Sequence, residues 1–567
     1  MLRPLLRIPA LLLACWLSPA AALLAQQPGL PIASAATHLL DRLAVISGVE
    51  APFHPQLRPL ARRDAAAYAR QVDSTAAILS EQDQADLRYL LDDSNEWLPD
   101  SLRRPSRRAL WRKLYRSPAN LYEVNTRDFV MRANPILHLQ AGGQGGDAQA
   151  LFQNQRGLEV RGHVDGKVYF FTQLLETQAR YPDYVSRWTE EYRALPGANA
   201  YKNYAPRIAD LRSAYDFGIA NAHIGVNVSR HVGLELGHGR HFIGNGYRSM
   251  FLSDAGAPTF YLKMNTRVWR FHYQNLFLEL NPAGPNAYTT SVRLPRKYAA
   301  VHYLSFQITP RMAVGLFEAT VFNRSDQFEL QYLNPVILYR SVESKIGSAD
   351  NALLGFDGRW NLWRRFQLYG QFLLDEFLAR ELIRPERSGW WGNKFALQAG
   401  LKYFNAFGID HLDLQAEYNL ARPYTWSHLD SLNSYTHYGQ PLAHPLWANF
   451  REIVGIARYP LGSRWLLAAR IIHARSGDDT PTQNWGTYPN LPYGTRVQDY
   501  GNRIGQGVAA RTLLLGFDLS WMWRHNLYVD ARLLLRTKAS DDPARDLSTR
   551  TASIGLRLNI WPQNFDF

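Results

Sequence analysis

The segment Arg422–Phe450 combines aromatic, imidazole and guanidinium side chains at high density. Flat aromatic faces can stack on the C–H faces of sugar rings, while histidine and arginine can hydrogen-bond hydroxyl or carboxylate groups. The segment therefore predicts a polysaccharide-binding site. An interfacial aromatic belt or a packed loop core would use the same residue types, and both remain alternatives. The candidate residues are Arg422, Tyr424, Trp426, His428, Tyr435, His437, Tyr438 and His444.

The same segment does not predict a metal centre or a hydrolase. Its histidines follow one another at intervals of nine and seven residues, so no short ligand pair is formed. Ser427 stands beside His428 but lacks the strand–turn–helix setting of a nucleophile. We therefore expect no catalytic residue, no metal and no cofactor.

Two acids in strand-like segments could serve glycoside hydrolysis if they faced each other about 5 to 10 Å apart. The alternation of Ala313–Asn323 predicts that Glu318 points into the fold, and Asp375 is expected to do the same. Asp375 and Glu376 cannot act together because neighbouring strand residues point to opposite faces. We favour a salt-bridged interior, in which such acids match inward arginines such as Arg161 and Arg532.

A glycine-rich stretch, Gly233–Asp254, places Gly237, Gly239, Gly244 and Gly246 close together. Neither a dinucleotide fingerprint nor a P-loop is completed there. The stretch is instead expected to form a wall strand over Val232–Phe242, then a bend that packs closely where a loop folds inward. Arg240 and Arg248 would pair with inward acids such as Glu318, or else contact an anion.

The amino terminus predicts export. Arg3 and Arg7 precede an apolar core that ends in small residues, which is typical of a secretory signal over residues 1–25. Cys15, the only cysteine, lies inside this segment, although a lipidated cysteine is an alternative. The net charge of +14 favours anionic partners, and export argues against nucleic acid.

Residues 26–122 predict a helical region. The apolar spacing after Ser34 is helical, Asp64 can cap a helix over Ala65–Leu79, and Ser80 with Asp83 resembles a capping box. A basic segment follows, either as a solvated helix face or as a contact with the rest of the chain or with phosphate groups. It comprises Arg103, Arg104, Arg107, Arg108, Arg112, Lys113 and Arg116.

From residue 123 to 567 the period changes to two. Segments of about ten residues alternate between apolar and polar faces, the length and pattern of strands that cross a bilayer. Short turns such as Asp165-Gly166 alternate with long loops such as Gly477–Arg503. The chain is therefore expected to form an all-β transmembrane barrel of about eighteen antiparallel strands in the cell outer membrane.

Around the glycine-rich stretch the sequence resembles the Wzi-type capsule-assembly outer-membrane proteins, especially the branch called gliding motility protein RemB. The matching pieces include residues 239–249 (Gly-Arg-His-Phe-Ile-Gly-Asn-Gly-Tyr-Arg-Ser), 316–319, 332–340, 349–355, 369–372, 417–419, 422–424 and 442–445. The family motif residues are Gly239, Arg240, Gly244, Gly246, Arg248, Ser249, Glu318, Asn334 and Asn351. The resemblance implies a periplasmic helical bundle under the barrel and a role in binding or anchoring capsular polysaccharide.

Three functions follow as hypotheses. The first is a non-enzymatic barrel that binds surface polysaccharide. The second is a porin-like diffusion channel, because a barrel of this size can enclose a pore. The third is an accessory protein of a gliding or secretion apparatus with protein partners. In all three the barrel contacts outer-membrane lipids and lipopolysaccharide.

Overall fold

The computed structural model describes residues 28–75, 79–106, 113–205, 214–284, 286, 294–324, 327–336, 338–339, 342, 350–383 and 388–567. The predicted signal segment, residues 1–25, therefore lies outside the described residues. None of the helices in the described ranges is long and apolar enough to cross a membrane.

Eighteen long strands form one closed antiparallel sheet, as the alternating pattern predicts. Each strand pairs with the next along the chain, and the last strand pairs with the first. The wall strands are β3 (Phe129–Gln144), β4 (Leu151–Val164), β5 (Val168–Arg180), β7 (Ala214–Asn227), β8 (Val232–Gly239), β10 (Thr259–Val268), β11 (Phe271–Leu280), β12 (Lys297–Thr309), β13 (Met312–Phe322), β14 (Asn351–Leu362), β15 (Phe366–Glu376), β16 (Lys394–Tyr403), β17 (Asp413–Ala421), β20 (Phe450–Leu461), β21 (Trp465–Asp478), β22 (Val508–Arg524), β23 (Leu527–Ser540) and β24 (Leu547–Leu558).

Short strands and helices lie beside this wall and in its loops. β2 (Tyr122–Asn125) pairs with β3, β6 (Lys202–Tyr204) pairs with β7, and β18 (Thr436–His437) pairs with β19 (Gln440–Pro441). Among the residues that the structure describes, helices α4 (Asp183–Tyr192) and α6 (Arg380–Ile383) lie in loops between strands.

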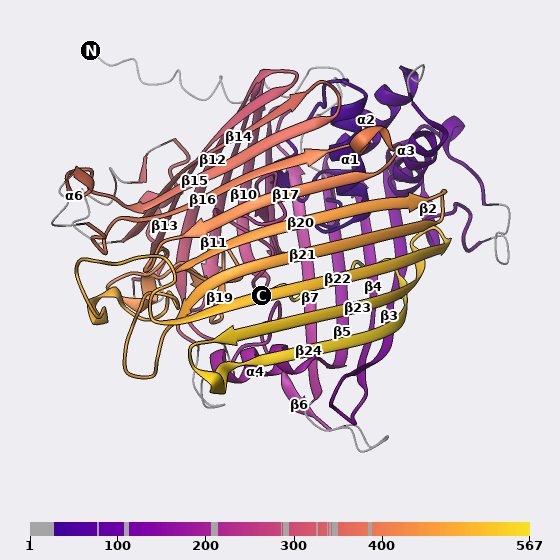
Figure 1. Ribbon diagram of the computed structural model, residues 1–567. Helices are drawn as coiled ribbons and strands as arrows, with labels where there is room; N and C mark the ends of the chain where they lie inside the picture. Colours follow the sequence, from indigo (N-terminus) through magenta and orange to yellow (C-terminus); the bar gives the residue numbers. More distant parts are fainter. Residues whose placement is uncertain are drawn as a thin grey trace, which may run out of the picture.

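The amino-terminal helices α1 (Ala35–Ile46), α2 (Arg62–Ser74) and α3 (Glu81–Asp93) gather at the barrel end that carries the short turns (Figure 1). The capping box of Ser80 and Asp83 is present at α3. The start predicted for the preceding helix is wrong. α2 begins at Arg62, and Asp64 lies in its first turn, where it pairs with Arg267 of the wall at 2.5 Å.

The predicted basic segment is only partly described. No α-helix runs through its described part, and Arg103 and Arg104 form ion pairs with Asp100 and Asp92. Arg107, Arg108 and Arg112 lie outside the described residues. Where it is described, this stretch therefore contacts the rest of the chain.

Large aromatic side chains surround the short-turn end of the wall on its outer face. Trp269 and Trp363 are each 77% exposed and Phe407 is 76% exposed, each in or beside a turn between consecutive strands. Aromatic belts of this kind mark the boundary of the bilayer in outer-membrane barrels, in which the short turns face the periplasm. The opposite end carries the long loops, with α6 and β19 on the left of Figure 1.

The interior of the barrel is filled rather than open along strands β10–β17. β1 (Leu57–Arg58) pairs inside with β9 (Phe242–Ile243), so the wall strand β8 ends at Gly239 and not at Phe242 as predicted. These inner segments and the loop 422–449 pack against the inward faces of the wall. The resulting apolar core includes Leu57, Phe251, Phe317, Leu373, Trp426 and Phe450.

This filling overturns the predicted direction of Glu318. Phe317, Ala319 and Val321 are fully buried against the inner core, and Phe317 stacks on Phe251 at 4.6 Å. Glu318 has the opposite parity and lies on the outer face of β13. The interior beside β13 is packed with apolar side chains. The apolar face of this strand therefore points inward to that core and not outward to lipid.

Candidate functional site

The loop 422–449 enters the barrel mouth, and most of its predicted sugar contacts are covered by protein. Tyr424, Trp426, Tyr435, His437 and His444 are at most 2% exposed, and His428 is also buried. Arg422 and Tyr438 alone among the eight candidates keep partial exposure. The buried rings cannot stack on a polysaccharide in this conformation, and they form a packed loop core.

Hydrogen bonds tie parts of the buried loop to the surrounding chain. Asp375, which points inward as predicted, accepts the main-chain N–H of Trp426 at 2.7 Å. His437 accepts from the Asn281 N–H at 3.1 Å through Nδ1, and its Nε2 lies 3.1 Å from the Pro258 oxygen. Burial lowers the pKa of His437 to about 3 and also lowers the pKa of His428 and His444. These imidazoles are therefore neutral at pH 7. The Glu452 carboxylate acts in the opposite direction on the pKa of His444, but burial is the larger effect.

The glycine-rich stretch is built for close approach, as expected. Gly244 has a φ of +150°, and a Cβ at Gly246 would lie 2.5 Å from Glu417 Oε2 and 2.7 Å from Gln398 Oε1. Glu417 in turn accepts the main-chain N–H groups of Tyr247 and Arg248, at 2.7 and 3.1 Å. The glycines let the chain wrap around a buried carboxylate of β17.

The two arginines of this stretch do not pair with Glu318. Arg248 donates to Glu452 of β20, and Arg240 donates to the main-chain oxygen of Gly197. Among the other motif residues, Ser249 donates to Ile243 O at 2.6 Å and Asn351 donates to Asn433 O at 3.0 Å. Asn334 is exposed in the loop after β13. The motif thus fixes inner loops to the wall.

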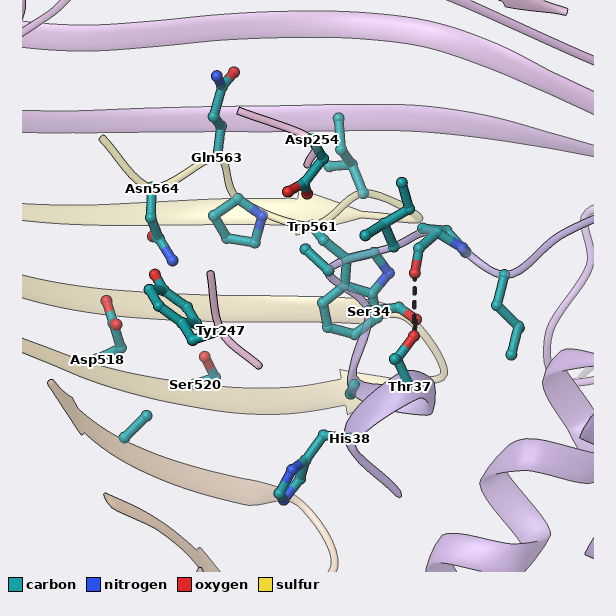
Figure 2. Close-up of a pocket in the computed structure, with 18 of the residues that line it drawn as sticks. Ser34, Thr37, His38, Tyr247, Asp254, Asp518, Ser520, Trp561, Gln563 and Asn564 are labelled. Atoms are coloured by element: carbon teal, nitrogen blue, oxygen red, sulfur yellow. Dashed lines mark hydrogen bonds between the residues drawn. The ribbon is translucent and has the colours of Figure 1, made fainter. Parts of the chain in front are cut away.

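A cavity of about 700 Å³ remains between this filling and the wall formed by strands β20–β24 together with β4, β5 and β7 (Figure 2). Figure 2 shows that the segment after β24, with Trp561, Gln563 and Asn564, folds back to line the cavity near Tyr247 and Asp518. Cationic side chains outnumber acids in the lining. Among the ion pairs there, Arg532 meets Asp518 at 3.2 Å and Arg470 meets Asp566 at 3.2 Å.

The predicted salt-bridged interior is confirmed for the arginines. Besides the Arg532–Asp518 pair, Arg161 contacts Glu96 at 2.8 Å and Glu159 at 2.5 Å, which ties the amino-terminal region to the wall. Asp375 pairs with Lys394 at 3.0 Å.

One group could in principle hold a cation. The ligand atoms of Asp83, Asp86 and His411 lie within 4.8 Å of one another. Asp83 already accepts from Arg42 and Ser80, however, and His411 Nε2 lies 2.7 Å from Ser80 Oγ. These hydrogen bonds hold α3 against the turn before β17, so the geometry does not favour a metal ion.

A partly exposed aromatic platform lies at the long-loop end, and the sequence analysis did not identify it. Trp391 and Tyr493 have ring centroids 4.6 Å apart, and the Arg496 guanidinium lies 4.4 Å from the Trp391 ring. Trp390 adjoins Trp391, and its main-chain oxygen accepts from Arg422 at 3.3 Å. We call Trp390, Trp391, Tyr493 and Arg496 the loop platform. In the sequence, the two adjacent tryptophans in a long loop are the feature that indicates this platform.

Main-chain hydrogen bonds hold the loop platform rigid. Trp391 N donates to Asp499 O at 2.8 Å, and Gly501 N donates to Ser388 O at 2.9 Å. Tyr493 N donates to His428 O at 3.3 Å, which joins the platform to the buried loop 422–449. Burial raises the pKa of Tyr493 and lowers that of Arg422. The buried aromatic loop therefore supports the loop platform.

The closed sheet, its apolar outer face and its aromatic boundary define an outer-membrane β-barrel fold. Among solved structures, the fold is similar to that of Wzi from Escherichia coli, described as an outer membrane protein involved in group 1 capsule assembly and as a carbohydrate-binding β-barrel. The two chains are 15% identical with a TM-score of 0.57, over 95% of this chain and 100% of Wzi.

Other solved barrels match less well. OprD from Pseudomonas aeruginosa gives a TM-score of 0.41 at 9% identity over 76% of this chain and 96% of OprD. OccAB2 from Acinetobacter baumannii gives 0.41 at 10% identity, over 76% and 97%. No protein-family model and no curated protein sequence matches the chain.

Proposed function

We propose that this chain is a non-enzymatic outer-membrane barrel that binds or anchors surface polysaccharide at the loop platform. The observation that carries the proposal is the set of aromatic rings left partly exposed at the long-loop end. Ring faces beside guanidinium groups suit an acidic glycan, because the rings stack on sugar C–H faces and the cations meet carboxylates.

The filled interior supports the same proposal. The buried loop 422–449 and the glycine-rich stretch occupy the barrel along β10–β17, and they hold the loop platform from below. The similarity to the fold of Wzi, itself a carbohydrate-binding barrel, agrees with this role. That the bound polysaccharide is the capsule is part of the proposal.

The test is binding of defined acidic and neutral polysaccharides to the purified chain in detergent, measured by affinity electrophoresis or calorimetry. We expect acidic glycans to bind wild type and Trp363→Ala, whose tryptophan is exposed at the opposite end. Trp391→Ala and Arg496→Ala should each bind at least tenfold more weakly. Equal binding by all four chains, or none, would refute the proposal.

A diffusion channel remains a second candidate because of the cavity along β20–β24. Its cationic lining would favour anions. Planar-bilayer conductance separates the two functions: stable anion-selective steps would support a channel, whereas a silent membrane would remove it.

A further inference from the structure

Three polar side chains stand in one row on the outer face of the wall. Asn275 of β11 pairs with His302 of β12, and His302 pairs with Glu318 of β13. Their sequence neighbours Leu276, Val301 and Phe317 are buried in the inner core, so this row faces outward. Polar groups on the lipid face of a barrel are costly at membrane depth, and such a row requires a cover.

The cover is the loop between β13 and β14. Tyr339 N donates to Glu318 Oε1 at 2.9 Å, and the Tyr339 ring lies 3.9 Å from the His302 ring. Asn275 donates to the main-chain oxygen of Pro335 at 3.3 Å. The described part of this loop therefore folds down outside the barrel and covers the polar row, in which Asn275 Oδ1 and His302 Nε2 have no hydrogen-bond partner among the described residues.

An aromatic cluster fixes the loop in place. Tyr332 and Tyr339 are fully buried, although they belong to a loop, and they pack with Phe277, Tyr298 and Phe322 from the outer faces of three strands. Tyr332 also donates to Asp350 at 2.6 Å. The described part of the loop is thus a fixed layer on the wall.

The aromatic boundary gives the depth of this layer. Phe271 pairs with Phe306 at the short-turn end, beside Trp269. His302 lies on the same face of β12 as Phe306, four residues further from the short-turn end. At a rise of about 3.4 Å per residue and a strand tilt of about 40°, the polar row is about 10 Å above this boundary, within an apolar band about 25 Å tall. Pro335 and Tyr339, which contact the row, lie at the same depth.

The outward side of the loop is largely apolar. Val336 is 82% exposed, Leu330 is 71% exposed and Leu333 is 38% exposed. They continue the apolar wall of β14, where Leu354 pairs with Glu318 and is also exposed. Gln331 and Asn334 are exposed among them, but Asn334 turns its Oδ1 back to the Val336 N–H at 3.1 Å.

We propose that the described part of the loop between β13 and β14 is a membrane-embedded element whose partner is the acyl chains near the middle of the outer membrane. Its underside seals the polar row Asn275–His302–Glu318, and its outer side replaces the lipid-facing wall of β11–β13. Continuity with the exposed apolar wall of β14 favours lipid over a second copy of the chain. This inference does not depend on the proposed polysaccharide binding.

The sequence permits a clean test because Cys15 is the only cysteine. With Cys15→Ser, the variants Val336→Cys and Leu330→Cys would each carry an environment-sensitive fluorophore in nanodiscs that hold one chain. Phe356→Cys, on the exposed outer face of β14, is the lipid control, and Thr482→Cys, exposed in the loop after β21, is the water control.

We expect the labels at positions 336 and 330 to emit at shorter wavelength than the label at 482. Doxyl-labelled acyl chains should quench them as strongly as the label at 356. Quenching by aqueous iodide without quenching by doxyl lipid would overturn the proposal. Protection that appears only when two chains share a disc would also overturn it, because the partner would then be a second copy.

Discussion

Arg248 donates through Nη2 to Glu452 Oε1 at 2.8 Å, with the two side chains only 8% and 0% exposed. The pair joins the inward glycine-rich segment to wall strand β20. Glu452 also accepts from Asn419 at 2.9 Å and lies 2.9 Å from His444 Nε2. Four segments of the fold therefore meet at one carboxylate, which ties the inner filling to the barrel.

Removal of the Arg248 cation should strongly lower the stability of the barrel. Arg248→Ala leaves a buried carboxylate without its main counter-ion, which costs about 3–5 kcal/mol in comparable sites. Urea unfolding of the refolded barrel measures the loss. The matched control is Arg296→Ala, because Arg296 and Glu279 form a partly exposed pair that should contribute about 0–1 kcal/mol. Equal effects of the two variants would contradict the assigned role.

Gly246→Ala should weaken the packing of the inner segment. The added methyl would lie 2.5 Å from Glu417 Oε2 and 2.8 Å from Arg248 O, and such overpacking costs about 1–3 kcal/mol. Gly239→Ala is the control, since its nearest neighbour would be 3.8 Å away. Trypsin cleavage after Arg240 and Arg248 should accelerate only in the Gly246 variant.

Trp426→Ala separates a packed core from a sugar contact. Trp426 is 2% exposed, so its loss should destabilise the barrel by about 3–5 kcal/mol. Polysaccharide affinity per folded molecule should stay unchanged, whereas Trp391→Ala should lower affinity and leave unfolding unchanged. Loss of affinity in a fully folded Trp426 variant would restore the sequence-based prediction.

These residues show how far the sequence could lead. Period-two alternation predicted the barrel and its strand number because each wall strand has two chemically different faces. The same alternation gave the wrong direction for Glu318, because β13 turns its apolar face to a filled interior and a loop covers its outer face. Whether Trp426 is a surface ring or a core ring depends on contacts with Asp375 and the inner core, which no local pattern encodes.

The docking of α3 should depend on pH through Asp86. Burial raises the pKa of Asp86 to about 7, so the folded state favours its protonated form. The contribution of Asp86 to stability should therefore fall as pH rises from about 4 to about 7, and stay low above that. Asp86→Asn should protect the helical region from protease at pH 8 but not at pH 4, relative to wild type. Asp73→Asn, at an exposed position of α2, should behave as wild type at both pH values.

The central claim is that the loop platform holds surface polysaccharide, and polysaccharide retention on cells tests it most directly. A deletion strain of the source organism would be complemented with wild type or with the Trp391→Ala, Arg496→Ala double variant, and cell-bound and released polysaccharide would be measured. We predict that deletion releases polysaccharide into the medium, that wild type restores retention, and that the double variant fails although its barrel assembles normally. Cells that keep their polysaccharide after deletion but stop moving on surfaces would contradict this account.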